Sequence, residues 1–344
     1  MNWKKTDVLA LMVGHGRSLD GSWDSGCVYG DYTEAALMLR IVKVAVKWLR
    51  KSGVRVITDS DDANNRNMKA SVAWANNKGA RLYMSVHCDY KLAPAGVYPL
   101  YRSEAGKKMA EAIGKSVAST MKMKFRGAAK RTELYELNAT KMTAVIFETG
   151  AIKADLKYLK DYKKYGKALA KAICKYIGVA LYVSRPVKVR RAVLAVVKKE
   201  KALGFKYKVS GNAMSWAVAK LKQRTTNCSR TISYGLQVAK ILKANQIFWI
   251  NGTKIVCKGS GTRTRLLKYY DVLHPKKATK NVKLKAGDIV GYGDPAHTMM
   301  FAGYDALGRA KWYSTGNQKA LNKGKAHIES KYNNRKIMTL LRLK

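Results

Sequence analysis

Long uncharged apolar runs are missing from this chain of 344 residues. A membrane-spanning helix needs about 20 consecutive apolar residues, so we expect no transmembrane segment. The opening MNWKKTDVLALMVGHG has a short apolar stretch interrupted by glycine and histidine, and it contains no small-residue cleavage site. We therefore expect synthesis in the cytoplasm without a signal peptide.

Acidic side chains are scarce, above all in the second half of the chain. There are 67 Lys and Arg against 22 Asp and Glu, a formal net charge of +45. Residues 1–180 hold 32 basic and 16 acidic side chains, whereas residues 181–344 hold 35 and 6. Such a field attracts polyanions, and nucleic acid, an anionic membrane and an anionic cell envelope all fit it. Hydrophobic residues make up 47% of the chain, which excludes a wholly disordered basic protein.

Cysteine is also sparse, with five residues, no C-x-x-C motif and no regular spacing. An odd number of irregularly spaced cysteines argues against a disulfide framework and against a structural zinc knuckle. We expect reduced thiols, most of them packed as small hydrophobes. Cys27 and Cys88 adjoin histidine motifs described below, and we assign them to packing.

The length predicts about two domains. Residues 1–180 alternate strand and helix patterns, which predicts a sheet flanked by helices. Residues 181–205 contain Pro186 and two basic runs, and this change of composition predicts a basic linker. Residues 206–344 then form a second domain, with helical patterns first and short strands after them.

Four polar residues stand where predicted elements begin or end. His15 lies in GHG, His87 in SVHCD and Glu148 in FETG, each at the carboxyl end of a predicted strand, and Glu34 opens a long helix. Ligands of open α/β sheets bind at that edge. Two imidazoles and one carboxylate are a common ligand set for a catalytic zinc, and a further carboxylate suits a base. Taken singly, each of the four has an ordinary structural explanation.

With their neighbours, these residues resemble the zinc-dependent N-acetylmuramoyl-L-alanine amidases over about residues 7–178. The motifs that carry the resemblance are Gly14-His15-Gly16, Asp24-Ser25-Gly26 followed by Glu34, Ser85-Val86-His87, and Glu148-Thr149-Gly150. The resemblance implies a twisted, mostly parallel sheet flanked by helices. It also implies Zn²⁺ held by His15, Glu34 and His87, whose activated water cleaves the amide between muramic acid and L-alanine while Glu148 moves the proton.

The second half contains a cysteine in a position typical of nucleophiles. Cys228 directly precedes an amphipathic helical pattern, and a helix N-terminus stabilises a thiolate. His297 opens a later strand, and this order resembles the papain-like NlpC and CHAP cell-wall peptidases over about residues 205–344. The resemblance implies an α+β papain-like domain with Cys228 as nucleophile and His297 as base. By position, Asn317 orients the imidazole, with Asp294 the weaker choice; in the alternative, Cys228 is a structural thiol.

Taken together, the patterns predict a modular peptidoglycan hydrolase of the phage endolysin type. It would be made in the host cytoplasm and act on the bacterial cell wall, with anionic envelope polymers as further partners. One alternative keeps the zinc amidase and makes the second domain a noncatalytic, basic wall-binding module. A remote alternative is a nucleic-acid-binding protein, but no zinc finger, recognition helix or RNP-like signature accompanies the basic residues.

Overall fold

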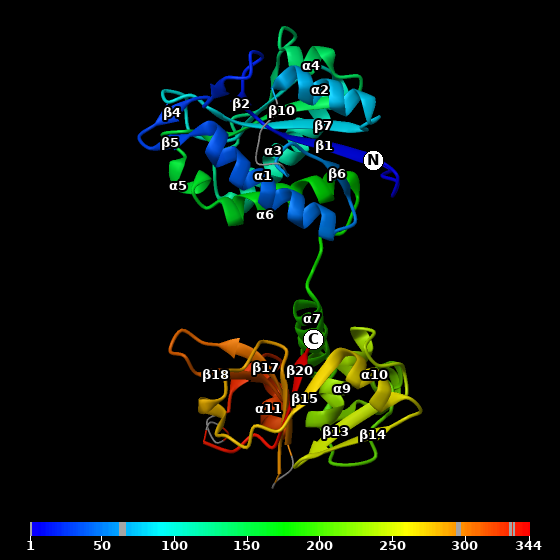
Figure 1. Ribbon diagram of the computed structural model, residues 1–344. Helices are drawn as coiled ribbons and strands as arrows, with labels where there is room; N and C mark the ends of the chain where they lie inside the picture. Colours follow the sequence, from blue (N-terminus) through cyan, green and yellow to red (C-terminus); the bar gives the residue numbers. More distant parts are fainter. Residues whose placement is uncertain (1, 62–66, 294–296, 330–331, 333) are drawn as a thin grey trace. The chain divides into compact units, whose positions relative to one another are not determined.

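The structure is a computed structural model that describes residues 2–61, 67–293, 297–329, 332 and 334–344 (Figure 1). The chain divides into two units, Met1–Tyr182 and Val183–Lys344, each with its own core. Among the described helices, none combines the length and the apolar character that crossing a membrane requires.

A six-stranded mixed sheet forms the centre of the first unit. In the order β6, β1, β7, β10, β8, β9, its strands are Arg55–Ile57, Val8–Val13, Leu82–Asp89, Thr143–Ala151, Tyr98–Tyr101 and Ala129–Lys130. The first four run parallel, and β8 is antiparallel to β10. Two small hairpins precede the first helix and consist of β2 (Gly16–Arg17), β3 (Trp23–Asp24), β4 (Val28–Tyr29) and β5 (Tyr32–Thr33). The expected mostly parallel sheet flanked by helices is confirmed.

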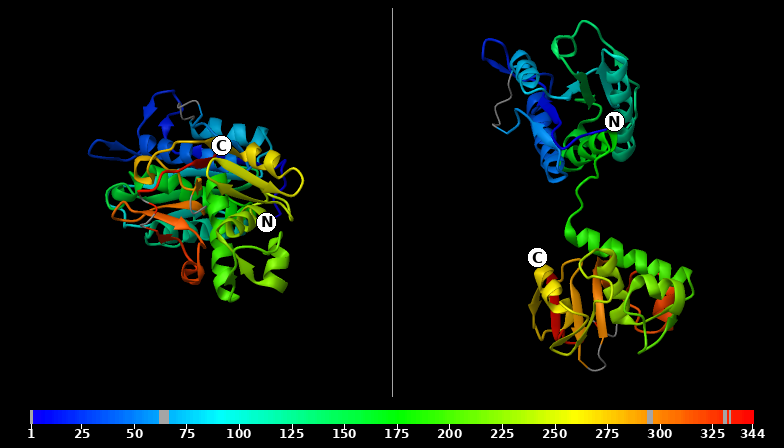
Figure 2. Two further views of the ribbon diagram at one scale, coloured as in Figure 1. Left: turned by 90° about the horizontal axis from the view of Figure 1, so that it is seen from below. Right: turned by 90° about the vertical axis from the view of Figure 1, so that its right-hand side faces the viewer.

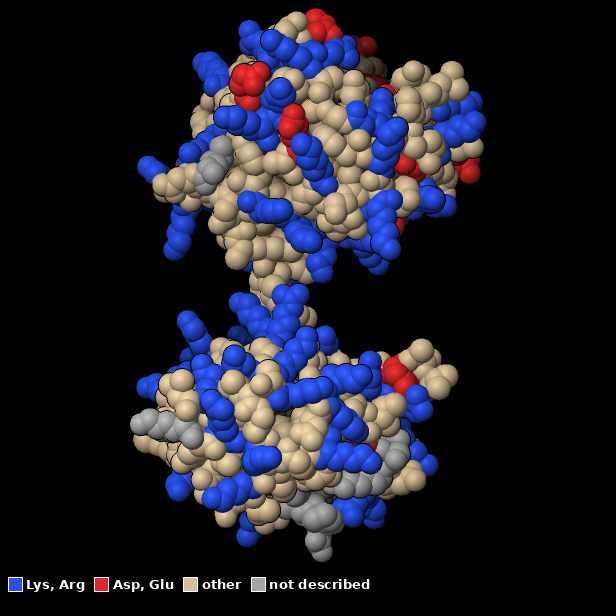
Figure 3. Space-filling view, turned by 180° about the vertical axis from the view of Figure 1, so that it is seen from behind, with Lys and Arg blue, Asp and Glu red and all other residues tan. Residues whose placement is uncertain are grey.

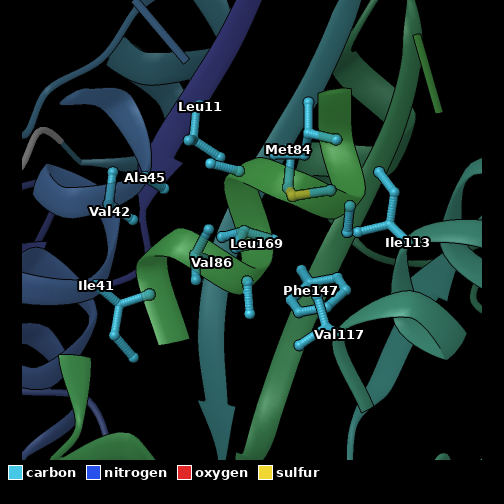
Figure 4. Packing of buried hydrophobic residues seen from close by; sticks show 14 of the residues in the cluster. Leu11, Ile41, Val42, Ala45, Met84, Val86, Ile113, Val117, Phe147 and Leu169 are labelled. Atoms are coloured by element: carbon cyan, nitrogen blue, oxygen red, sulfur yellow. The ribbon is translucent and has the colours of Figure 1, made fainter. Parts of the chain in front are cut away.

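Helices cover both faces of this sheet. One face carries α1 (Glu34–Lys51), α3 (Glu104–Met121) and α6 (Tyr162–Ile177), with the short α5 (Leu156–Leu159) beside α6. The other carries α2 (Met68–Asn77) and α4 (Tyr135–Ala139). Figure 4 shows the first layer, in which α1 side chains meet strand side chains and Leu169 of α6; the labelled residues include Ile41, Val42, Leu11, Val86 and Phe147.

Helix α1 begins where the sequence predicts, and its start has a clear local cause. The side chain of Thr33 accepts a hydrogen bond from the Ala36 N–H and caps the helix. Apolar residues at spacings of three and four bury one face, so the helix packs on the sheet. Glu34 therefore lies in the first turn, beside the ends of the central strands.

The second unit is an α+β structure around an antiparallel sheet. In the order β15, β20, β16, β17, β18, β19, its strands are Tyr270–Leu273, Thr339–Leu343, Ile289–Tyr292, His297–Tyr304, Ala310–Tyr313 and His327–Ile328. Two further strand pairs are β11 (Lys206–Tyr207) with β12 (Thr225–Thr226), and β13 (Ile247–Asn251) with β14 (Lys254–Lys258). The helices are α7 (Arg185–Ala202), α8 (Trp216–Val218), η1 (Ala219–Gln223), α9 (Cys228–Val238), α10 (Thr262–Tyr269), η2 (Thr279–Asn281) and α11 (Gln318–Lys323).

Residues 181–205, expected to be a basic linker, are mainly helix α7 of the second unit (Figure 2). Proline stands in its first turn, where a missing N–H costs nothing. Valines at helical spacing lie in the core of the unit: Val189, Val193, Val196 and Val197. Arg190 and Arg191 lie between Val189 and Val193, and a run of lysines follows Val197. The basic runs therefore belong to a helix with one buried face.

The close packing of α7 on α9 generates a prediction. A Cβ on Gly235 of α9 would lie 2.3 Å from Val193 Cγ2 and 2.8 Å from Val193 Cα. We expect Gly235→Ala to lower the free energy of unfolding by about 1–3 kcal/mol in urea, because overpacking outweighs the better helix propensity of alanine. Lys199→Ala, on the exposed face of α7, is the control. Equal stability of the wild type and Gly235→Ala would contradict the close packing of α7 on α9.

Candidate functional site

The parallel strands of the first unit bring the predicted site residues to one edge. Val13, the last residue of β1, is in register with Val86 of β7, and Glu148 of β10 is in register with His87. His15 follows β1, and Glu34 opens α1 at the same edge. The four residues singled out from the sequence therefore lie together.

Glu34 stands between the two histidines. Its Oε1 lies 3.1 Å from His87 Nδ1, and its Oε2 lies 3.4 Å from His15 Nε2. The other nitrogen of His15, Nδ1, is 2.7 Å from Asp24 Oδ2. The two imidazole rings are edge to face, with centroids 5.1 Å apart. One nitrogen of each ring thus faces the same carboxylate.

Two glycines allow this close approach. A Cβ on Gly14 would lie 2.4 Å from His87 Nδ1, and a Cβ on Gly26 would lie 2.7 Å from Glu34 Oε2. His15 has a φ of 63°, a conformation that non-glycine residues adopt rarely and mostly at functional sites. The glycines of the GHG and Asp-Ser-Gly motifs are therefore required by the side chains packed against them.

Glu34 is 2% exposed, and each oxygen of its carboxylate has polar partners. Its two oxygens accept hydrogen bonds from the backbone N–H groups of Cys27 and Cys88, at 3.1 and 3.0 Å. Burial alone would raise its pKa, but the hydrogen bond and charge of His87 and the charge of His15 lower the pKa to about 2. Glu34 is thus an ionised carboxylate at neutral pH.

These three residues fit a metal ion. One ligand atom each from His15, Glu34 and His87 lies within 4.8 Å of the other two. Two imidazole nitrogens with one carboxylate oxygen are a donor set typical of catalytic zinc, which keeps one position open for water. The carboxylate of Asp24 holds the ring nitrogen of His15 that faces away from the set, as in most zinc–histidine sites.

Glu148 lies beside His87 on the neighbouring strand. Its Oε2 is buried and has no hydrogen-bond partner among the described residues. Burial raises its pKa to about 8, and the charge of Glu34 acts in the same direction. A carboxyl in this state can hold and release a proton near neutral pH.

A cavity of about 570 Å³ opens beside the three candidate ligands and reveals a further carboxylate. Its lining includes His15, His87 and Glu136, but not Glu148. Oε2 of Glu136 is 3.6 Å from His87 Nε2, and its Oε1 accepts a 2.6 Å hydrogen bond from Tyr83. Glu136 was not predicted from the sequence, because no sequence pattern distinguishes it from the exposed Glu133 three residues earlier.

The second unit places Cys228 at the N-terminus of a helix, as expected. Cys228 is the first residue of α9, and the side chain of Asn227 caps the helix by accepting from the Arg230 N–H at 3.0 Å. A cavity of about 370 Å³ lies over the thiol and includes Trp249 and Thr298 in its lining. The thiol therefore faces a space that can admit a substrate.

His297 is the partner of this thiol, and its own partners differ from those expected. Its Nε2 is 3.0 Å from Ser314 Oγ and 3.8 Å from Glu329 Oε2. Asn317, expected to orient the imidazole, instead caps α11 by accepting from the Ala320 N–H at 2.8 Å. The carboxylate near this imidazole is that of Glu329. Asp294, the weaker choice, lies outside the described residues.

Cys228 and His297 shift each other's pKa. Burial alone would raise the pKa of the thiol, but the hydrogen bond and charge of His297 lower it overall. Burial alone would lower the pKa of His297, but hydrogen bonds with Cys228 and Glu329 raise it to about 9. These directions favour a thiolate and an imidazolium, the pair that a cysteine nucleophile needs.

Known proteins similar to this chain match part of its length. A curated protein of Clostridium perfringens, described as an uncharacterized 38.4 kDa protein, is 30% identical over 151 residues, which are 40% of this chain and 44% of that protein. The match thus spans less than half the length of that relative.

Solved amidase structures align with about half of the chain. The catalytic domain of the amidase CwlV from Bacillus (Paenibacillus) polymyxa var. colistinus is 23% identical, with a TM-score of 0.46, and covers 51% of this chain and 99% of its own. The amidase AmiC2 of Nostoc punctiforme is 23% identical, with a TM-score of 0.46, and covers 50% and 98%. Residues 9–178 match the family model of N-acetylmuramoyl-L-alanine amidase (Amidase_3), and this match spans nearly all of the first unit.

Proposed function

We propose that the first unit hydrolyses the amide bond between N-acetylmuramic acid and L-alanine in peptidoglycan, with Zn²⁺ held by His15, Glu34 and His87. The observation that carries this proposal is the convergence of the three ligand atoms within 4.8 Å, in a segment that matches the amidase family model. The cavity of about 570 Å³ beside these residues gives the substrate access to them.

In this proposal the protein supplies positioning and proton transfer. Zinc would supply a Lewis acid for the carbonyl and an acidified water. Asp24 is hydrogen-bonded to the ring nitrogen of His15 that does not face Glu34, and Glu136 lies 3.6 Å from the corresponding nitrogen of His87. Glu148 accepts the proton of the attacking water and donates it to the nitrogen of the leaving L-alanine.

We propose a second, thiol-dependent hydrolase in the second unit, of the papain-like type expected from the sequence. The Cys228 sulfur attacks an amide carbonyl of the stem peptide, and His297 protonates the leaving amine; water then releases the acyl group. The support is the His297 imidazole between the thiol and the Glu329 carboxylate, next to a cavity.

The basic surface supports an anionic partner. Lysines and arginines cover the face of the second unit seen in Figure 3, with few acidic side chains among them. We propose that this surface binds the phosphates of envelope polymers, which brings the catalytic sites to the wall. The endolysin type and synthesis in a host cytoplasm stay predictions.

The role of Glu148 generates the first prediction of this proposal. We expect Glu148→Ala to keep bound zinc, because Glu148 is not a ligand, and to abolish the release of muramic-acid-linked peptides from purified peptidoglycan. Zinc content and new L-alanine amino termini are the measurements. Glu133→Gln, an exposed carboxylate, is the control. A zinc-loaded Glu148→Ala protein with wild-type release of L-alanine amino termini would refute the assignment.

Glu136 is expected to act through His87. Loss of a carboxylate behind a metal-bound histidine weakens metal affinity by about 10–100-fold. We expect Glu136→Gln to weaken zinc binding by this order in a competition titration with a chelator, whereas Glu133→Gln leaves it unchanged. If Glu136→Gln instead keeps full zinc affinity and loses all activity, Glu136 rather than Glu148 carries the proton.

The paired state of Cys228 and His297 predicts a pH dependence of alkylation. The lowered pKa leaves thiolate below the usual thiol pKa of about 8.5, so iodoacetamide should modify Cys228 rapidly at neutral pH. Cys257, whose pKa burial raises, is the internal control. His297→Ala should move the rise in alkylation rate to higher pH, and Glu329→Gln should lower the His297 pKa from about 9. Equal rates for Cys228 and Cys257 in the wild type would favour a noncatalytic second unit.

A further inference from the structure

Two thiols meet directly behind the candidate metal ligands of the first unit. Cys27 follows the Asp-Ser-Gly motif, Cys88 follows His87 in β7, and their sulfur atoms are 3.7 Å apart. Cys27 is partly exposed, whereas Cys88 is buried. They are 61 residues apart in the sequence, so a link between them would close a long loop.

The same two residues hold Glu34 in place. Their backbone N–H groups donate to the two oxygens of its carboxylate, and the Glu34 N–H donates to the Cys27 carbonyl oxygen at 2.9 Å. The loop that carries Cys27 and the strand that carries His87 are therefore joined through one carboxylate. A bond between the two sulfurs would join them covalently at the same place.

We propose that Cys27 and Cys88 are a redox-active pair that closes to a disulfide when the protein meets a small-molecule disulfide oxidant. Sulfurs in a disulfide are about 2.05 Å apart, so the thiols need to approach by roughly 1.7 Å. The Cys27 thiol already lies 3.5 Å from the Cys88 carbonyl oxygen, so it faces the strand that carries Cys88.

The chemistry balances with oxidised glutathione as the oxidant. The Cys27 thiolate attacks one sulfur of glutathione disulfide, forms a mixed disulfide and releases one glutathione. The Cys88 sulfur then attacks the Cys27 sulfur, loses its proton and releases the second glutathione. The protein loses two protons and two electrons, and glutathione disulfide gains them to become two molecules of glutathione.

Formation of the disulfide would stabilise the metal site. A cross-link lowers the conformational entropy of the unfolded and partly open chain, and this effect grows with the length of the closed loop. In the reduced protein, a second group of side chains could hold a metal ion: Cys27, Glu34 and Cys88. This group shares Glu34 with the two histidines and so competes with them for the metal. Disulfide formation removes its two thiol ligands. This consequence, unlike disulfide formation itself, rests on the proposed zinc function.

The experiment oxidises the full-length protein with glutathione disulfide and maps its tryptic peptides by mass spectrometry. Cys27 lies in the peptide 18–40 and Cys88 in the peptide 82–91, so the disulfide joins two peptides that are otherwise separate. The rate at which a chelator removes zinc is then compared for reduced and oxidised protein. Cys27→Ser tests the pair, and Cys257→Ser, at a half-buried thiol of the second unit, is the matched control.

We expect the joined peptide in the wild type and in Cys257→Ser but not in Cys27→Ser. Oxidation should slow the loss of zinc several-fold in the wild type and in Cys257→Ser, and leave it unchanged in Cys27→Ser. Glutathione attached to Cys27 or Cys257 without the joined peptide would overturn the proposal. A joined peptide with unchanged zinc loss would overturn its coupling to the metal site. If the reduced wild type binds no zinc, the proposed amidase mechanism fails, while the peptide map still decides whether the disulfide forms.

Discussion

The first unit depends on how one buried negative charge is held. Burying an ionised carboxylate is costly unless charges and hydrogen bonds compensate it. Glu34 meets this condition through two backbone N–H groups and two imidazoles, which come from the loop before α1, from the end of β1 and from β7. The carboxylate thus fixes three separate segments relative to one another, and the two histidines face the same point because both face Glu34.

The second unit has six acidic residues in 162 positions, and most of them have defined surroundings. Asp288 pairs with Arg342 and Asp305 with Arg309, so both serve local structure. Glu329 lies near His297 and His327. Glu200 lies fully buried in α7, where Thr231 of α9 donates to its carboxylate at 3.0 Å and burial raises its pKa to about 8. Two of the six therefore lie around the helix and strand that carry Cys228 and His297, while the outer surface remains basic.

Site residues that belong to short motifs could be predicted from the sequence, whereas site residues that are brought into place by packing could not. Strand ends in a parallel sheet share an edge, so His15, His87 and Glu148 could be placed together from the positions of the strands alone. Glu136 and Glu329 could not be found in this way, because a carboxylate in a loop or short helix has no periodic signal. The role of Asn317 depends on packing in the same way. An asparagine before a helix can accept a hydrogen bond from a backbone N–H of the first turn, and here Asn317 accepts from the Ala320 N–H and caps α11.

Glycines lie directly against several of the histidine and glutamate side chains that the sequence motifs identified. Gly14 lies against His87, Gly26 against Glu34, and Gly316 of the second unit against His297, with a Cβ there only 2.7 Å from the ring. A glycine at each of these positions allows an imidazole or a carboxylate to approach the backbone. In each unit a histidine lies against a glycine, and a carboxylate oxygen lies 3.6 or 3.8 Å from one of its ring nitrogens. A carboxylate near the ring favours the protonated or metal-bound form of the imidazole. In the proposed function, the basic surface attracts an anionic polymer at longer range, while the carboxylates keep the histidines in the state that the reaction requires.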